Sequence, residues 1–177
     1  MDLASFVQRS EGEWRSMRSG HSLAFQHFEE VLSKISIEKL DVEDPRVKEL
    51  IATHSELNIE PVSPFRMEWS AESDWEPDDP NDVSAGSCVL VPLPLDEHSG
   101  WLLRSVGYAE AEQATGQYRL LEEGTFILKT RYGQSIAEER IWFVSDNVRC
   151  RASVLRTSEG SGVLQTSFSS EVRRIRV

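Results

Sequence analysis

The sequence has little cysteine and no long apolar run, and each shortage excludes a class of protein. Its 177 residues contain only two cysteines, Cys88 and Cys150. A small disulfide-stapled secreted domain uses more, so we interpret both as free thiols. No apolar stretch approaches the roughly 20 residues that span a bilayer. The residues after Met1 also lack the basic and apolar parts of a signal peptide, so we expect no membrane insertion.

Positive charge is scarce as well. Lysine and arginine number 19 against 30 acidic residues, which gives a net charge of −11 and a pI near 4.8. Such a surface repels phosphate backbones, so we expect no nucleic-acid partner. The four histidines lack the spacing of a zinc site, and no P-loop, nucleophile elbow or dinucleotide fingerprint occurs. We therefore expect no metal and no cofactor, and conventional hydrolase, kinase or dehydrogenase chemistry has no support.

The length and the 39% of hydrophobic residues predict one domain over residues 1–177. Two short helices are expected within it. Asp2–Arg9 begins with a capping aspartate, and a second helix follows Asp44, has Pro45 at its first position and ends near His54.

The remaining segments have the alternation and turn residues of β-strands. The predicted strands are Glu13–Gln26, Glu30–Leu40, Pro64–Ser70, Ser87–Pro94, Trp101–Tyr108, Gln117–Leu121, Thr125–Tyr132, Gln134–Val144, Val148–Thr157 and Val163–Val177. Tight turns between successive strands predict an all-β antiparallel meander of roughly ten strands, and closure into a barrel removes exposed edges. A small barrel can hold one ligand. A sandwich covered by a helix is the alternative.

One predicted strand carries a row of polar groups. Arg149, Arg151 and Ser153 share a face because side chains alternate along a strand. The preceding strand carries Glu138 and Glu139 opposite this row. Two guanidiniums and a hydroxyl form a plausible clamp for carboxylates. The alternative is a solvated outer face, which is where charged rows on strands usually lie.

Two further segments add candidate site residues. Met67 and Trp69 share a strand face and Trp75 follows in a loop, so these side chains either belong to the core or form a flat wall for a conjugated ligand. Arg18 lies on one strand face with Trp14, and from sequence alone it can point outward to solvent or inward as an anion partner.

These segments belong to an ordered set of motifs along nearly the whole chain. They are Gly12-x-Trp14-x-Ser16-x-Arg18-Ser19-x-His21-x-Leu23-Ala24-Phe25, Met67-Glu68-Trp69 with Trp75, Ser87-x-Val89-Leu90-Val91-Pro92, Leu102–Glu110, Glu138–Phe143, Asn147–Leu155 and Phe168-x-Ser170-Glu171-Val172-Arg173. In this set the chain resembles the CpcS/CpeS family of phycobiliprotein lyases, which includes CpcU.

The resemblance implies a lipocalin-like or fatty-acid-binding-like barrel that carries an open-chain bilin, phycocyanobilin or phycoerythrobilin. The lyase would promote thioether attachment of this bilin to a cysteine of an apo-phycobiliprotein subunit. The implied catalytic residues are Glu139 and Arg149. The implied substrate-binding residues are Arg18, Met67, Trp69, Trp75, Arg151 and Ser153. The bilin is a substrate here, and neither Cys88 nor Cys150 is the attacking thiol.

Other functions remain open from the sequence. The main alternative is a non-catalytic bilin carrier, or a partner subunit of a heterodimeric lyase. A fatty-acid or haem carrier is a third reading. The resemblance implies the cytoplasm of a cyanobacterium or a plastid of an alga as the location, and a homodimer or a heterodimer with a sister lyase subunit as the possible assembly.

Overall fold

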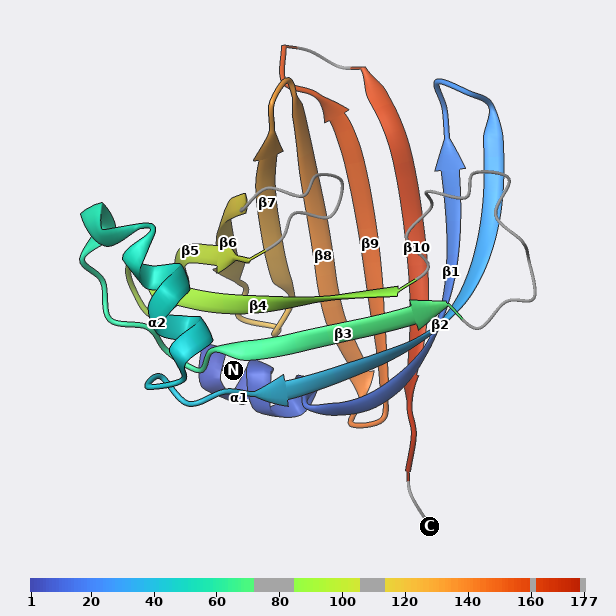
Figure 1. Ribbon diagram of the computed structural model, residues 1–177. Helices are drawn as coiled ribbons and strands as arrows, with labels where there is room; N and C mark the ends of the chain where they lie inside the picture. The colour runs from blue at the N-terminus through green and yellow to red at the C-terminus, as the bar shows by residue number, and fades with distance from the viewer. Residues whose placement is uncertain (72–84, 106–113, 160–161, 176–177) are drawn as a thin grey trace.

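The computed structural model describes residues 1–71, 85–105, 114–159 and 162–175, and its main feature is a closed antiparallel barrel (Figure 1). The strand order around the barrel is β1-β10-β9-β8-β7-β6-β5-β4-β3-β2, and β2 pairs with β1 to close it. Each strand therefore pairs with its neighbours in sequence, and the first strand also pairs with the tenth. The predicted barrel is confirmed over the sandwich.

The element bounds are α1 Leu3–Ser10, β1 Gly12–Ser22, β2 His27–Lys39, α2 Pro45–Ala52, the 3₁₀ turn η1 Ser55–Leu57, β3 Phe65–Ala71, β4 Ala85–Pro94, β5 Ser99–Arg104, β6 Ala114–Leu120, β7 Phe126–Tyr132, β8 Ser135–Ser145, β9 Val148–Thr157 and β10 Val163–Arg173.

Both predicted helices are confirmed with their caps. The Asp2 carboxylate accepts a hydrogen bond from the Ser5 amide at 2.8 Å, and Asp44 accepts one from the Arg46 amide at 2.9 Å. Several strand ends differ from the sequence prediction. The prediction that the first strand continues to Gln26 is wrong, because β1 ends at Ser22, residues 23–26 form a turn and β2 begins at His27. The described part of β5 ends at Arg104, with the predicted extension to Tyr108 partly outside the described residues, and β10 ends at Arg173.

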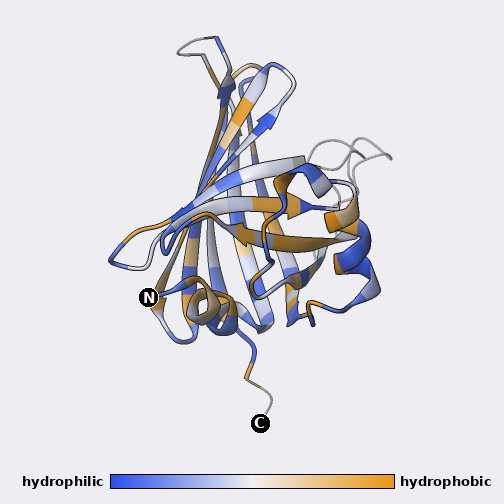
Figure 2. Cartoon of the chain, turned by 90° about the vertical axis from the view of Figure 1, so that its left-hand side faces the viewer, coloured by the Kyte–Doolittle hydropathy of each residue, from blue (hydrophilic) through white to orange (hydrophobic). Residues whose placement is uncertain are grey.

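Strand alternation separates an inner from an outer barrel surface. On β1, Trp14 and Ser16 are buried while Arg15 and Met17 are exposed. Figure 2 shows hydrophilic and hydrophobic segments interspersed along the strands. The register across neighbouring strands then fixes which residues meet inside the barrel.

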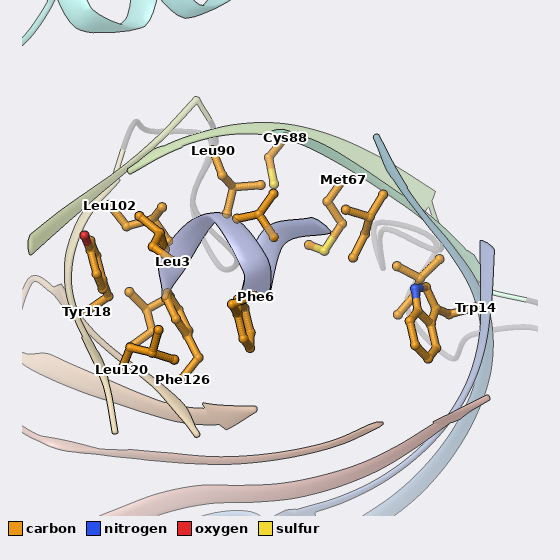
Figure 3. Packing of buried hydrophobic residues seen from close by; sticks show 14 residues of the cluster. Leu3, Phe6, Trp14, Met67, Cys88, Leu90, Leu102, Tyr118, Leu120 and Phe126 are labelled. Carbon is orange, nitrogen blue, oxygen red and sulfur yellow. The ribbon is translucent and has the colours of Figure 1, made fainter. Parts of the chain in front are cut away.

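Helix α1 lies inside the ring of strands and fills one end of it (Figure 3). Its Phe6 ring stacks on Phe126 with centroids 4.7 Å apart and meets Phe143 edge-on at 5.7 Å. Leu3 and Val7 on the same helix are buried in this cluster. We call the end of the barrel that α1 fills the helix end.

Hydrogen bonds from Arg173 fix α1 in place. Its guanidinium donates to the carbonyls of Arg9 and Glu11 at the end of the helix, and its Nε donates to the Asp146 carbonyl in the β8–β9 turn at 3.2 Å. Arg9 in turn forms an ion pair with the Asp146 carboxylate at 3.2 Å. These contacts attach the C-terminal end of α1 to both β10 and the β8–β9 turn.

Helix α2 covers the outer surface of β4 and β5. Val47 and Leu50 of the helix are buried in a second cluster with Val91 and Leu103. Strand β4 is consequently buried on both faces, which explains its nearly continuous apolar sequence. In the described part of the chain, neither helix has the length and apolar character needed to cross a membrane.

We call the opposite end of the barrel the hairpin end. Described turns at this end lie between β1 and β2 and between β7 and β8 (Figure 1). The barrel interior between the two ends holds the candidate site.

Candidate functional site

The row predicted on β9 points into the barrel. The register sets Arg149 opposite Phe143 and Glu171, and these neighbours lie on the inner faces of β8 and β10. Arg151 and Ser153 continue the same inner face toward the hairpin end. The shared face expected from the sequence is confirmed, and the alternative of a solvated outer face is wrong for this row.

The deepest of these side chains is Arg149, which is paired with a carboxylate that sequence reasoning had not assigned. Arg149 and Glu171 are only 2% and 1% exposed, and the Arg149 Nε donates to the Glu171 carboxylate. The guanidinium also lies 4.6 Å over the ring of Trp14. Burial lowers the pKa of Arg149 from its usual value, and the charge of Glu171 opposes this shift. Among the described residues, the Arg149 Nη2 has no hydrogen-bond partner.

A second charged cluster surrounds Glu139. The Arg104 Nη2 donates to Glu139 Oε2 at 2.9 Å, and the Arg151 Nη1 lies 3.7 Å from Glu139 Oε1. Arg104 also donates to the Tyr132 hydroxyl at 3.1 Å. The cluster brings together side chains from β5, β7, β8 and β9, so the barrel register and not sequence proximity assembles it. Two guanidiniums flank one carboxylate, which fixes the Glu139 side chain.

Toward the hairpin end the inner surface becomes more exposed to water. Arg18 on β1 pairs with Glu29 on β2 at 2.7 Å, and these side chains are 37% and 38% exposed. The Ser153 hydroxyl lies 3.1 Å from that of Ser167 on β10. Arg18, whose direction the sequence left open, is thus on the inner face, where a ligand entering from this end would meet it.

The predicted aromatic wall lies on β3. Trp69 is half-buried and faces inward, and its ring lies against Gly86 of β4, where a Cβ atom would come within 2.4 Å of the indole. A glycine at this position lets the indole lie flat on the neighbouring strand. Met67 is buried in the apolar cluster beside Cys88. Trp75 lies outside the described residues.

The two cysteines are free and lie on different faces of the barrel wall. Cys88 is buried inside, and this burial raises the pKa of its thiol to about 11. Cys150 lies on the outer face of β9, and burial raises the pKa of its thiol as well. Neither thiol is activated as a nucleophile at neutral pH.

The described residues contain no cluster of three or more His, Cys, Asp or Glu side chains that could hold a metal ion. What they contain instead is an interior lined by charged pairs. Its positive members are Arg18, Arg104, Arg149 and Arg151, and its negative members are Glu29, Glu139 and Glu171. These seven side chains carry one net positive charge, so the interior suits an anionic ligand.

Sequence reasoning missed Arg104, Tyr132, Glu29 and Glu171. Arg104, Tyr132 and Glu171 lie on predicted strands, whereas Glu29 falls just before the predicted start of its strand. Arg104 and Glu171 also fall within the family-like motifs, but nothing marked them as inward-facing. The available signal was parity: Glu171 shares its face with Ser167 and Ser169, which oppose the arginine row once β9 and β10 are paired. The sequence of neither strand alone predicts that pairing register.

Comparisons with known proteins agree with this fold. The family model described as "CpeS-like protein" matches residues 2–174. The chain is 53% identical to "Chromophore lyase CpcS/CpeS 3" of Trichodesmium erythraeum, over 98% of this chain and 99% of that protein. It is 33% identical to "Phycocyanobilin lyase subunit CpcS" of a Picosynechococcus species, over 97% of this chain and 86% of that protein. Among solved structures, an S-type phycobiliprotein lyase CPES from Guillardia theta is 39% identical with a TM-score of 0.82, covering 100% of this chain and 95% of that chain.

Proposed function

The chain belongs to the CpeS-like family, and from this premise we propose that it is a phycobiliprotein lyase. It binds an open-chain bilin, phycocyanobilin or phycoerythrobilin, and promotes thioether attachment of this bilin to a cysteine of an apo-phycobiliprotein subunit. The observation that carries the proposal is the inward-facing row of Arg149, Arg151 and Ser153 beside Glu139, in a barrel whose interior has excess positive charge.

The arginine row would bind the propionate groups of the bilin. A guanidinium is planar and matches a carboxylate with two parallel hydrogen bonds. Arg149 has an Nη2 without a partner among the described residues, and Arg151 lies two positions nearer the hairpin end on the same face. Arg18 extends this basic surface to the part of the interior that water reaches.

The rings of the bilin would pack on apolar and aromatic side chains. Trp69 offers a half-buried indole face above Gly86, and indoles stack well on conjugated systems. Met67 would pack beneath it from the apolar cluster. Trp75 is proposed from the sequence alone, since it lies outside the described residues.

Glu139 would accept hydrogen bonds from the pyrrole nitrogens of the bilin. Its carboxylate is fixed by Arg104 and Arg151, so it is oriented before the ligand arrives. Holding charge next to ring A favours the protonated, more electrophilic bilin. The acceptor thiolate then adds to ring A, a carbon–sulfur bond forms, the bilin takes up one proton, and no group leaves.

The attacking thiol belongs to the acceptor subunit. Cys88 is buried with a pKa of about 11, and Cys150 lies on the outer wall. The protein contributes positioning, which prevents addition at the wrong atom. The reaction needs neither metal nor cofactor because the bilin is itself the substrate. The location proposed for it is the cytoplasm of a cyanobacterium or a plastid, where phycobiliproteins are assembled.

The second candidate function is a bilin carrier or one subunit of a heterodimeric lyase. It is favoured by the description of the Picosynechococcus relative as a lyase subunit. The two candidates differ in one result, which is whether this chain alone accelerates adduct formation on an apo-subunit.

The first experiment mixes the purified chain with phycocyanobilin, and separately with phycoerythrobilin, with and without apo-phycobiliprotein. Visible spectra report the bilin complex, and denaturation in acid urea shows whether colour remains on the acceptor. A coloured complex with faster, cleaner covalent product supports the lyase. A complex without covalent gain supports the carrier or subunit, and the absence of any complex contradicts both.

A matched pair of variants tests the arginine row. Arg149→Ala removes an inward guanidinium, whereas Arg140→Ala removes one from the outer face of β8. We expect the first variant to bind bilin at least tenfold more weakly and the second to bind as the parent does. Equal binding by both variants contradicts the propionate clamp.

A further inference from the structure

The turn between β1 and β2 and the start of β2 expose apolar side chains that a solvated hairpin does not need. Leu23 is 52% exposed, Phe25 85% and Phe28 50%. Single exposed apolar residues are common on protein surfaces, but three within six positions form a patch. We call these three residues the hairpin tip.

The backbone of the hairpin tip is held in place. The Leu23 amide donates to the Leu164 carbonyl of β10 at 2.9 Å, and β1 pairs with β2 as far as Ser22 and His27. The ring of Phe28 lies against His21 with centroids 4.8 Å apart. These contacts fix the backbone on both sides of Phe25, so the exposure of the tip does not come from fraying of the strands.

The hairpin tip stands at the end of the barrel where the candidate site is accessible. The same two strands carry Arg18 and Glu29 on their inner faces, and this ion pair is partly exposed to water. The other end of the barrel is filled by α1 (Figure 1). Of the two ends, the one that carries the tip is where the described interior side chains meet water, so we infer that a thiol supplied by another protein approaches from there.

The size of the patch indicates what kind of contact it makes. From typical side-chain areas, the three side chains expose roughly 350 Å² of apolar surface. A stable dimer buries about 800 Å² on each partner, so a second copy of this chain would not be held by this patch alone. The area suits a transient partner that arrives, reacts and leaves.

We propose that the hairpin tip docks the acceptor subunit, through apolar surface beside its accepting cysteine. Docking there brings the thiol to the hairpin end of the barrel, next to the bilin held on the arginine row. This inference rests on the proposed lyase function and adds the surface through which the protein partner is recognised. It makes Phe25 a determinant of acceptor affinity and gives it no part in bilin binding.

The test compares Phe25→Ser with Leu95→Ser. Leu95 is 60% exposed in the β4–β5 turn at the helix end, so its replacement also removes exposed apolar surface, but far from the tip. For each variant, bilin affinity is measured by absorbance titration. The transfer rate is then measured against the concentration of recombinant apo-phycobiliprotein subunit.

The expected result is a KM for the apo-subunit raised about tenfold in Phe25→Ser, with kcat and bilin affinity unchanged and Leu95→Ser like the parent. An unchanged KM in Phe25→Ser overturns the docking surface while leaving the lyase function intact. Loss of the bilin complex in that variant also overturns it, because the tip would then belong to the bilin site.

Two further outcomes are separated by controls on the parent protein. Sedimentation that shows a parent dimer and a Phe25→Ser monomer assigns the tip to self-association and overturns the proposal. Failure of the parent chain to form any bilin complex refutes the lyase function, and the docking inference falls with it.

Discussion

The two parts of the barrel interior differ in the side chains that line them, which are apolar in one and charged in the other. Around α1 the inner surface is apolar and aromatic, with Phe6, Trp14 and Phe126 in one cluster. Packed directly against this cluster, and continuing toward the hairpin end, are buried ion pairs, of which Arg149–Glu171 is the deepest. Apolar burial stabilises a fold at about 25 cal/mol per Å², whereas a buried ion pair rarely exceeds the cost of desolvating its charges. The first half holds the barrel together, and the second half prepares it for a charged ligand.

The sharpest way to break this division is to damage the apolar half. Phe6→Ala removes a ring that stacks on Phe126 and leaves a cavity, so we expect a loss of about 4 kcal/mol in the free energy of unfolding. The protein that remains folded should bind bilin with unchanged affinity. Urea unfolding and absorbance titration measure the two quantities, and Phe25→Ala on the exposed hairpin serves as the control.

Removing one charge of a buried ion pair in the other half should lower the stability of the fold. Removing its partner as well should restore stability but not bilin binding. Glu171→Leu leaves the Arg149 guanidinium buried without its counter-charge, and we expect a loss of about 3 kcal/mol. The double variant with Arg149→Met should regain most of that stability but bind bilin at least tenfold more weakly. Urea unfolding and bilin titration of the parent, the single variant and the double variant measure the stability and the affinity. A double variant that binds bilin normally would show that the pair is structural.

The apolar half contains an ionisable group of its own in Cys88, which gives a pH test. Its folded-state pKa of about 11 lies above the 9.0 of an unperturbed thiol, because burial disfavours the thiolate. The neutral thiol therefore stabilises the fold fully below about pH 9, and this contribution is lost as the pH rises toward 11. We expect a decline of about 2 kcal/mol over that window that is absent in Cys88→Val. Denaturant titrations of both proteins at pH 8 and pH 11 measure this difference. An equal decline in stability in the parent and in Cys88→Val would contradict the prediction.

The smallest expected effect concerns the geometry of the charged half. Arg104→Lys keeps the charge beside Glu139 but loses the fork that also reaches Tyr132. We expect bilin affinity to fall about tenfold, or ~1.4 kcal/mol. The matched control is Arg140→Lys. It makes the same change in an arginine that pairs with Glu138 on the outer face of β8, the strand that carries Glu139 on its inner face. Should both variants bind bilin equally, Arg104 has no positioning role.

The sequence predicts the two helices, the strands and the shared face of the arginine row, because capping residues and a two-residue period are local signals. Whether that face lies inside or outside is not local. It depends on closure of the barrel, which is why a solvated row was a fair alternative for Arg149 and Arg151. The same reason left the direction of Arg18 open until its pairing with Glu29 appeared.

The charged clusters were beyond prediction for a different reason. Arg104 and Glu139 lie 35 positions apart and on strands that are not neighbours, so their contact requires the register of every strand between them. The buried partner of Arg149 likewise follows only from the pairing of β9 with β10. The roles of these residues in binding a bilin stay predictions, and so does the role of Trp75.

The hydrogen bonds from Arg173 to the end of α1 have a consequence for biosynthesis. The seam of the barrel pairs Trp14 with Arg173, and the same arginine binds the carbonyls of Arg9 and Glu11. Strand β1 therefore leaves the ribosome long before the strand that must seal it, and its edge waits for a partner while translation continues. Such distant pairings also slow folding. A nascent chain stalled before β10 should remain unsealed, sensitive to protease and prone to associate through the free edge of β1.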